Sequence, residues 1–379
     1  MGKQANGRGT IKKRSDGRWE AQYTVHYERK SIYGKTEAEV AKKLNQVLYE
    51  IESGAFVNDT VTVEQWLHTW LSEYVKGHVK QKTYQGYEIN VRVHLVPALK
   101  KIKLKHLTAD QVQRLLNQKI KDGLSTNTVS YIKRTLHAAL GEAIRNGLLI
   151  RNVAHGAKVQ SVKKKDRRIL TLQEQESLIK ALEGKHWGFA VEFALFTGLR
   201  AGELLGLRWC DVDMKEKVIT IRQTVQRLYG EDGKSRLQFD TPKTSKSNRT
   251  IPLLGKLADK LHRHYTKQLK ERERVGELWE DNNLVFCTEL GKPIDSSNFS
   301  RFLANMSEKA GIPRVNIHCL RHSFTTRARD MGVELEVVSE FLGHSDIRLT
   351  ANVYTSVLME RKKSEMQKMN KLFKKGGKV

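Results

Sequence analysis

The alternation of apolar and polar residues near the start of the chain predicts a small sheet covered by a helix. Asp16-Gly17 is a typical hairpin turn, and apolar residues alternate with polar ones over 19–27, as in a strand with one buried face. Thr36 begins a helix-capping motif, and apolar residues then recur at helical spacing over 40–51. We therefore expect a β-β-β-α domain over residues 1–56.

The next segment, 61–158, has the pattern of a helical domain. Its first apolar stripe consists of Val63, Trp66, Leu67, Trp70 and Tyr74. A second capping motif begins at Thr108, and another stripe runs over 129–143. Aromatic residues at this spacing favour a packed core over a platform for stacked bases.

The last segment, 168–379, has a mixed pattern. Helices are predicted over 172–182 and 187–196, short strands over 218–221 and 250–253, and helices from there to the end, with a polar stretch between the two strands. The expected fold class is a multidomain chain, mainly α with small β-sheets.

Basic residues outnumber acidic ones, and the excess is uneven. The 379 residues include 68 Lys+Arg and 42 Asp+Glu, a formal net charge of +26. Residues 61–165 carry +13, whereas residues 1–60 carry +3 and residues 166–379 carry +10. Such a concentration of one sign predicts docking on a polyanion, with nucleic acid as the first choice and an anionic membrane surface as the second.

Several other protein classes lack support. The three cysteines are far apart, which excludes a disulfide framework. No apolar stretch is long enough to span a bilayer, and the first residues lack the apolar core of a secretory signal. There is no P-loop, no HExxH and no Cys/His cluster at zinc spacing, so we expect neither a metal nor a cofactor.

Cations suited to phosphate contact form four groups along the chain. They lie in the N-terminal hairpin, between helices of the middle segment, in the charged stretch 161–168 and before the last strand. The candidates are Lys12, Lys13, Arg14, Arg18, Lys100, Lys101, Lys103, Lys105, Lys163, Lys164, Lys165, Lys246 and Arg249. Solvated surface is the alternative for the N-terminal hairpin and for the group before the last strand. The stretch 161–168 is either a solvated linker or a tether across a DNA backbone.

Residues suited to phosphate chemistry follow one another in the last segment. The motifs are FTGLRAGELL with Arg200 and Glu203, TPKTSKSNRTIPL with Lys243, HCLRH with His318 and Arg321, LGH ending in His344, and NVYT with Tyr354. Each motif alone is typical of ordinary structure. Together, two arginines can stabilise charge that develops on phosphate oxygens, and a tyrosine can serve as nucleophile if a base and a positive field activate it.

In this order, Arg, Lys, His-x-x-Arg, His and Tyr resemble the signature of the tyrosine recombinase (phage integrase) family, and the whole chain resembles integrases of conjugative transposons and temperate phages. The resemblance implies that Arg200 and Arg321 hold the scissile phosphate and that Tyr354 attacks it to form a 3′-phosphotyrosine link. It implies that Lys243 is the general acid, with Lys246 as the alternative. It further implies that His318 assists proton transfer, His344 hydrogen-bonds the phosphate and Glu203 supports the site.

The same resemblance implies the division of labour. Residues 1–56 would bind arm-type DNA sites, 61–158 core DNA, and 168–379 would form a mixed, mainly α catalytic domain with a tail helix over 357–379. The expected activity integrates and excises a mobile element through a Holliday junction, without added metal or ATP.

The expected partners are double-stranded DNA and three further protein copies in a tetramer that exchanges the tails. An excisionase or a host DNA-bending protein is a further expected partner, no membrane is expected, and the location would be the bacterial cytoplasm at the nucleoid. A type IB topoisomerase-like enzyme and a catalytically silent DNA-binding regulator are the alternative functions. Packing of the tail on its own domain is the alternative to exchange.

Overall fold

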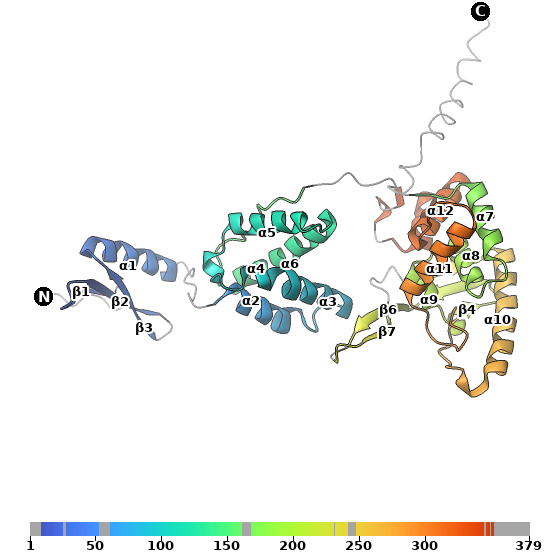
Figure 1. Ribbon diagram of the computed structural model, residues 1–379, viewed down its shortest axis with the longest axis horizontal. Helices are drawn as coiled ribbons and strands as arrows, with labels where there is room; N and C mark the ends of the chain where they lie inside the picture. Colours follow the sequence, from blue (N-terminus) through green and yellow to red (C-terminus); the bar gives the residue numbers. More distant parts are fainter. Residues whose placement is uncertain are drawn as a thin grey trace, which may run out of the picture. The chain divides into compact units, whose positions relative to one another are not determined.

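The computed structural model describes residues 9–25, 28–52, 61–160, 168–230, 232–241, 248–344, 346–348 and 350–351. The chain divides into two compact units, Met1–Lys163 and Lys164–Val379. The expected further division of the first unit into arm-type and core-binding domains stays a prediction. Figure 1 labels the elements of each unit and colours them by their place in the sequence.

The first elements form the small sheet that the alternation predicts. Strands β1 (Thr10–Lys13), β2 (Trp19–Val25) and β3 (Glu28–Gly34) pair antiparallel in that order, and helix α1 (Glu37–Glu52) packs against them. Ala21 is paired with Ile11 and Ile32 across the sheet. It lies in a cluster with Val40 of α1, so one face of the sheet is covered by the helix (Figure 1).

The other elements described in the first unit are helical. Its elements are α2 (Val63–Thr69), the π-helical turn η1 (Trp70–Val75), α3 (Gln81–Ile89), a second π-helical turn η2 (Asn90–Leu95), α4 (Val96–Leu99), the 3-10 turn η3 (Leu104–His106), α5 (Ala109–Lys121) and α6 (Thr126–Arg145). Trp66 and Trp70 are each 3% exposed, and the indole of Trp66 donates a hydrogen bond to the Ala139 carbonyl at 2.9 Å. The aromatic stripe is therefore core, as predicted.

The second unit combines helices with two small sheets. It begins with α7 (Leu172–Leu182), α8 (Gly188–Thr197), α9 (Ala201–Leu205) and η4 (Trp209–Asp211). Strands β4 (Val212–Asp213), β5 (Val218–Ile221) and β8 (Arg249–Pro252) form one antiparallel sheet, and β6 (Thr224–Tyr229) and β7 (Ser235–Asp240) form the other. The last described elements are α10 (Gly255–Val275), η6 (Gly276–Leu278), α11 (Ser296–Lys309), α12 (Ile317–Asp330) and α13 (Leu335–Leu342). The expected fold class is confirmed.

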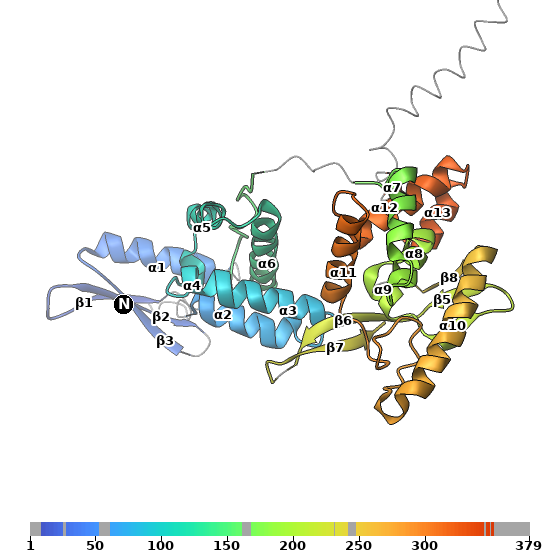
Figure 2. The ribbon, with the colours of Figure 1, turned by 45° about the vertical axis from the view of Figure 1, so that its right-hand side comes forward.

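Two regions of this unit differ from the predicted pattern. The polar stretch between the two predicted strands contains the hairpin β6–β7, which extends from the helices in Figure 2. In addition, the chain between η6 and α11 forms no helix, although helices were expected throughout. None of the helices in the described ranges has the length and apolar character needed to cross a membrane.

Candidate active site

A tight turn between α8 and α9 places the first candidate arginine. Gly198 ends α8 with φ 66°, a left-handed conformation that glycine adopts readily. A Cβ atom there would lie 2.6 Å from Cδ1 of Phe324 and 2.8 Å from Cδ2 of Leu342, so the backbone also approaches α12 and α13 closely. Arg200 follows at the N-cap of α9.

The guanidinium of Arg200 is held by two protein acceptors. Its Nη1 donates to Oε1 of Glu203 at 2.7 Å, and its Nη2 donates to the Gly343 carbonyl at 3.2 Å. The other carboxylate oxygen of Glu203 accepts the backbone N–H of Arg200 at 3.1 Å. The Arg200 side chain is 37% exposed, so this positioned cation still faces solvent.

Arg321 lies one layer deeper, on the buried face of α12. It is 5% exposed, and its Nη1 donates to the Gly198 carbonyl at 2.7 Å. Its Nη2 donates to the Leu342 carbonyl and to Nε2 of His344, each at 2.7 Å. Burial and the charge of Arg200 lower the pKa of Arg321 to about 9, so it remains a cation at neutral pH.

His344 completes this cluster in its neutral form. A guanidinium can only donate, so Nε2 of His344 must accept, and the ring proton lies on Nδ1. Nδ1 is 2.7 Å from the hydroxyl of Thr350, which is buried and can accept that proton. Burial and the charges of Arg321, Arg200 and Arg249 lower the pKa of His344 to about 3.

His318 lies one helical turn before Arg321. It is on the first turn of α12, is exposed, and forms no part of the hydrogen-bonded cluster among the described residues. Partial desolvation, followed by the charges of Arg321 and Arg200, lowers its pKa, so its ring lies within the field of both arginines. A neutral imidazole there has the capacity to accept a proton.

Glu203 binds Arg249 as well as Arg200. Arg249 is one of the residues expected from the sequence to contact DNA. The Glu203 carboxylate is 2% exposed and accepts from Nη2 of Arg249 at 2.9 Å and from Nη1 at 3.2 Å. Burial alone would raise the pKa of Glu203, but the hydrogen bond and charge of Arg249, together with the charge of Arg200, outweigh it and lower the pKa. Glu203 is therefore an ionised bridge between two arginines.

Arg249, a candidate for contact with DNA, binds other protein groups in this structure. Its side chain is 7% exposed and is turned towards Glu203. Along β8, Thr250 and Pro252 are exposed while Ile251 is buried, so alternation puts Arg249 on the same inward face as Ile251. That alternation is the signal in the sequence that could have revealed its burial.

The remaining candidates fall into two groups. Lys163, Lys164, Lys165, Lys243, Lys246, Tyr354 and the tail 357–379 lie outside the described residues. The described lysines Lys100, Lys101, Lys103 and Lys105 are all exposed around η3. In the N-terminal hairpin, Lys12, Lys13, Arg14 and Arg18 are also exposed. Lys12 and Arg14 each lie 3.5 Å from Glu20, and Arg18 pairs with Asp16 at 2.8 Å.

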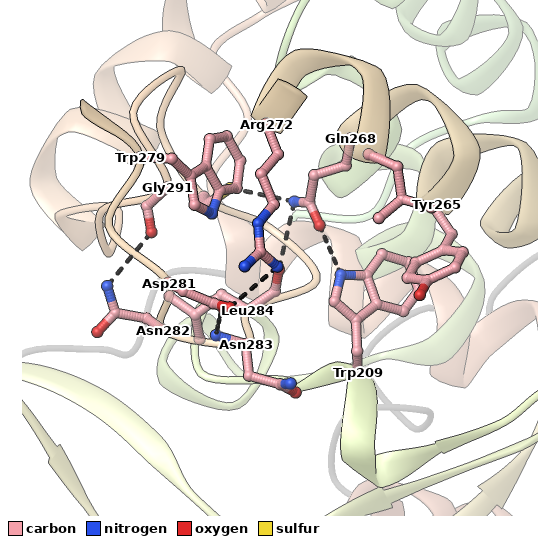
Figure 3. Close-up of a pocket in the computed structure, with 12 residues that line it drawn as sticks. Trp209, Tyr265, Gln268, Arg272, Trp279, Asp281, Asn282, Asn283, Leu284 and Gly291 are labelled. Carbon is pink, nitrogen blue, oxygen red and sulfur yellow. Dashed lines mark hydrogen bonds and ion pairs between the residues drawn. The ribbon is translucent and has the colours of Figure 1, made fainter. Parts of the chain in front are cut away.

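A separate small cavity of about 100 Å³ lies between α10 and the loop after η6 (Figure 3). Gln268 crosses it, accepting from the indole of Trp209 at 2.5 Å and donating to the Leu284 carbonyl at 3.3 Å. Arg272 and Asp281 form an ion pair of 3.0 Å at its wall. None of the candidate catalytic residues that the structure describes lines this cavity, and these internal bonds hold the loop against α10.

Within the described ranges, no group of three or more His, Cys, Asp or Glu side chains could hold a metal ion. The candidate site thus presents two oriented arginines, a neutral histidine and a bridging glutamate around the turns at Gly198 and Gly343. Such an arrangement suits the binding of a tetrahedral anion.

The sequence profile described as "Phage integrase family" matches residues 168–361, just over half of the chain. The chain belongs to the phage integrase family. A second profile, "Phage integrase, N-terminal SAM-like domain", matches residues 62–120. The helical segment of the first unit thus has its own counterpart in the family.

Curated relatives match most of the chain. It is 32% identical to a "Tyrosine recombinase XerC-like" protein of Caldanaerobacter subterraneus, over 91% of this chain and 92% of that protein. It is 23% identical to the "Transposase from transposon Tn916" of Enterococcus faecalis, over 83% and 80% of the two chains. It is 26% identical to the integrase of Staphylococcus phage L54a, over 80% and 92%.

Solved structures share the fold of the recombinase. The Tn1549 transposon integrase in complex with a circular intermediate DNA has a TM-score of 0.69 at 23% identity and covers 82% of this chain and 100% of that one. A lambda integrase tetramer bound to a Holliday junction has a TM-score of 0.56 at 18% identity, covering 93% and 96%. The recombinase is a tyrosine-type site-specific recombinase of the kind that integrates mobile DNA elements.

Proposed function

We propose that the recombinase cuts and rejoins DNA through a 3′-phosphotyrosine intermediate, with the scissile phosphate held by Arg200 and Arg321. The observation that carries this proposal is the convergence of both guanidiniums on the turns at Gly198 and Gly343. Lys243, from the segment before β8, and Tyr354, from the segment after α13, would complete the site.

The proposed chemical step is a transfer between two oxygens. The phenolic oxygen of Tyr354 attacks phosphorus, a new P–O bond forms, and the bond to the 5′ oxygen breaks. His318 receives the phenolic proton, and Lys243, or Lys246 in its place, donates a proton to the departing 5′ oxygen. Because the phosphate stays esterified, the reverse reaction with another 5′-hydroxyl reseals a strand without ATP.

The two arginines supply the electrostatic stabilisation. Negative charge builds up on the non-bridging phosphate oxygens as the tyrosine attacks, and preorganised donors at those oxygens lower the barrier. A single such donor is worth about 2.7–4 kcal/mol in other enzymes. Arg321 is fixed by the carbonyls of Gly198 and Leu342, and Arg200 by Glu203 and the carbonyl of Gly343, so neither has to be reoriented when the phosphate arrives.

His344 must change its role when DNA binds. In the described state its Nε2 accepts from Arg321, so it has no proton there to offer a phosphate oxygen. A bound phosphate brings negative charge that favours the protonated ring. We propose that His344 gains a proton at Nε2 on phosphate binding and then donates that proton in a hydrogen bond to a non-bridging oxygen.

DNA contacts outside the site follow from the charge distribution. The exposed lysines around η3 suit the phosphate backbone of core DNA, because they lie within the strongly basic segment 61–165. The uncovered face of the N-terminal sheet carries Lys12, Gln22 and Ser31, which suits the groove of arm-type DNA.

The proposed assembly is a tetramer of recombinase subunits on two DNA sites. Strand exchange would proceed through a Holliday junction, with tails 357–379 docked on neighbouring subunits and with an excisionase or a DNA-bending protein setting direction. The element would be a conjugative transposon or a temperate phage, and the reaction would take place at the nucleoid in the bacterial cytoplasm.

A plasmid with two attachment sites tests this function. We expect the wild-type protein to resolve the plasmid into two circles and a Tyr354→Phe variant to bind the sites without recombining them. Relaxation of supercoils by the wild-type protein, without recombinant circles and without site preference, would instead indicate a topoisomerase. Site binding by the wild-type protein with neither reaction would indicate a silent regulator.

A further inference from the structure

Arg249 is a buried arginine at the start of β8. Its strand pairs with β5, where Ile221 lies opposite Arg249, and its side chain points away from solvent, with 7% exposure. A permanently charged side chain is costly to bury unless it is paired and hydrogen-bonded. The partners of Arg249 therefore indicate why it is there.

The partners described for Arg249 come from two elements of the candidate site. Arg249 binds the Glu203 carboxylate with both terminal nitrogens, at 2.9 Å and 3.2 Å, and its Nε donates to the Phe341 carbonyl at 2.6 Å. The first contact reaches α9, which follows Arg200, and the second reaches the last turn of α13, just before His344. One side chain thus connects β8 to both segments.

The turn at Gly343 is shaped around this guanidinium. A Cβ atom on Gly343 would lie 2.9 Å from Nη1 and 3.1 Å from Cζ of Arg249. The carbonyl of the same Gly343 accepts from Arg200. The backbone that holds Arg200 and precedes His344 therefore rests directly on Arg249.

Arg249 also affects how strongly Glu203 holds Arg200. If Arg200 were the sole cation bound to the Glu203 carboxylate, the carboxylate would neutralise the positive charge with which Arg200 binds the phosphate. Because Arg249 takes both carboxylate oxygens, one negative charge is shared between two positive ones, and Arg321 adds a third nearby. The cluster keeps a net positive charge at the exposed side of Arg200.

We propose that Arg249 is a positioning residue for DNA cleavage, which acts through Glu203 on Arg200 and through the turn at Gly343 on His344. This inference rests on the proposed function. The role proposed for Arg249 differs from direct contact with DNA. It also differs from that of the general acid, Lys243 or Lys246, which protonates the leaving group. A lysine cannot replace it, because one ammonium cannot bind both carboxylate oxygens in a planar fork and the Phe341 carbonyl as well.

The test compares full-length variants Arg249→Gln, Arg249→Lys, Glu203→Gln and the double variant Arg249→Gln/Glu203→Gln. Arg208→Gln is the matched control, because Arg208 donates to a buried carboxylate, Asp211, at a similar 2.7 Å without touching a candidate catalytic residue. Each protein is assayed for single-site DNA binding, melting temperature and covalent adduct formation. The cleavage substrates carry either an oxygen or a sulfur at the bridging 5′ position.

We expect both Arg249 variants to bind a single site normally and to cleave about 100-fold more slowly, the loss typical of a misplaced catalytic group. The sulfur substrate should not restore the rate. A 5′-thiolate departs without being protonated, so this substrate compensates only for the loss of the general acid. The double variant should be as slow as Arg249→Gln, because both changes break the same link. The Arg208→Gln control should cleave at the wild-type rate.

Three results would overturn the inference. They are a wild-type cleavage rate for Arg249→Gln despite a lower melting temperature, full rescue of Arg249→Gln by the sulfur substrate, and a rate loss in the double variant equal to the product of the two single losses.

A measurement that needs no reaction distinguishes failure of this inference from failure of the proposed function. In the full chain, the isotope-labelled ring of His344 is titrated by NMR. Its pKa should be higher in Arg249→Gln than in wild type, because the variant lacks the neighbouring positive charge and the support that Arg249 gives to the turn at Gly343. An unchanged titration contradicts the role of Arg249 even if no protein forms an adduct.

Discussion

Substitution of Gly343 by alanine probes how closely the active-site turn depends on Arg249. Gly343 has φ 61° and ψ 47°, and the added methyl group would lie 2.9–3.1 Å from three atoms of Arg249. A solvent-exposed arginine would move aside at little cost. Arg249 cannot, because its guanidinium donates to Glu203 twice and to Phe341 once.

The expected loss of stability has two contributions. A left-handed conformation costs an alanine roughly 1–2 kcal/mol. Loss of one hydrogen bond that involves a charged group costs about 1.5–3 kcal/mol more. We therefore expect Gly343→Ala to lower the free energy of unfolding by about 2.5–5 kcal/mol, with a clear fall in melting temperature.

Gly332→Ala is the matched control. Gly332 follows α12 with φ 87°, but no heavy atom lies within 4 Å of the place that the added methyl group would occupy, so this variant has the backbone cost alone. At a temperature where both variants are folded, cleavage of a suicide substrate should be about 100-fold slower for Gly343→Ala and normal for Gly332→Ala. Equal cleavage rates in the two variants would refute the link between the turn and the active site.

Three other predictions concern separate parts of the chain. The DNA-free protein should lose stability as pH falls from about 6.5 towards 3, because His344 takes up a proton in the unfolded chain but not in the folded one, and His344→Gln should flatten the melting-temperature profile in that range. Deletion of 357–379 should abolish cooperative pairing of two sites while single-site binding persists, and unchanged pairing would contradict tail exchange. Glu20→Gln should release Lys12 and Arg14 for phosphates, so fluorescence anisotropy over a salt series should show a steeper salt dependence of arm-DNA binding, and an unchanged slope would contradict this.

Local signals in the sequence predicted many elements well. Helix α7 has the predicted bounds because Thr171 and Glu174 form a reciprocal N-terminal cap and the apolar residues that follow keep helical spacing. Strand β5 also matches, since its alternate residues Ile219 and Ile221 are buried. Gly343 ends α13 in the left-handed conformation that glycine commonly adopts after a helix.

Other features depend on partners distant in the chain. The hairpin β6–β7 was not predicted, because Arg227 and Arg236 interrupt the apolar positions of its strands. It also packs against α9, and the sequence pattern does not reveal this contact. Arg249 was assigned to DNA because of its charge, although Ile251 marks the inward face of β8 that Arg249 shares. The order of the candidate catalytic residues is visible in the sequence. The carbonyls that orient the two arginines are not, because they come from the turns at Gly198 and Gly343.

The proposed cleavage requires that Tyr354, which follows α13 in the sequence, becomes covalently joined to DNA. The most direct test incubates the full-length protein with a suicide substrate of its attachment DNA in EDTA and maps the modified peptide by mass spectrometry. We expect a metal-independent adduct at Tyr354 through a 3′ phosphate and no adduct with Tyr354→Phe. An adduct on another residue, an adduct that persists in Tyr354→Phe, or cleavage that stops in EDTA would contradict it.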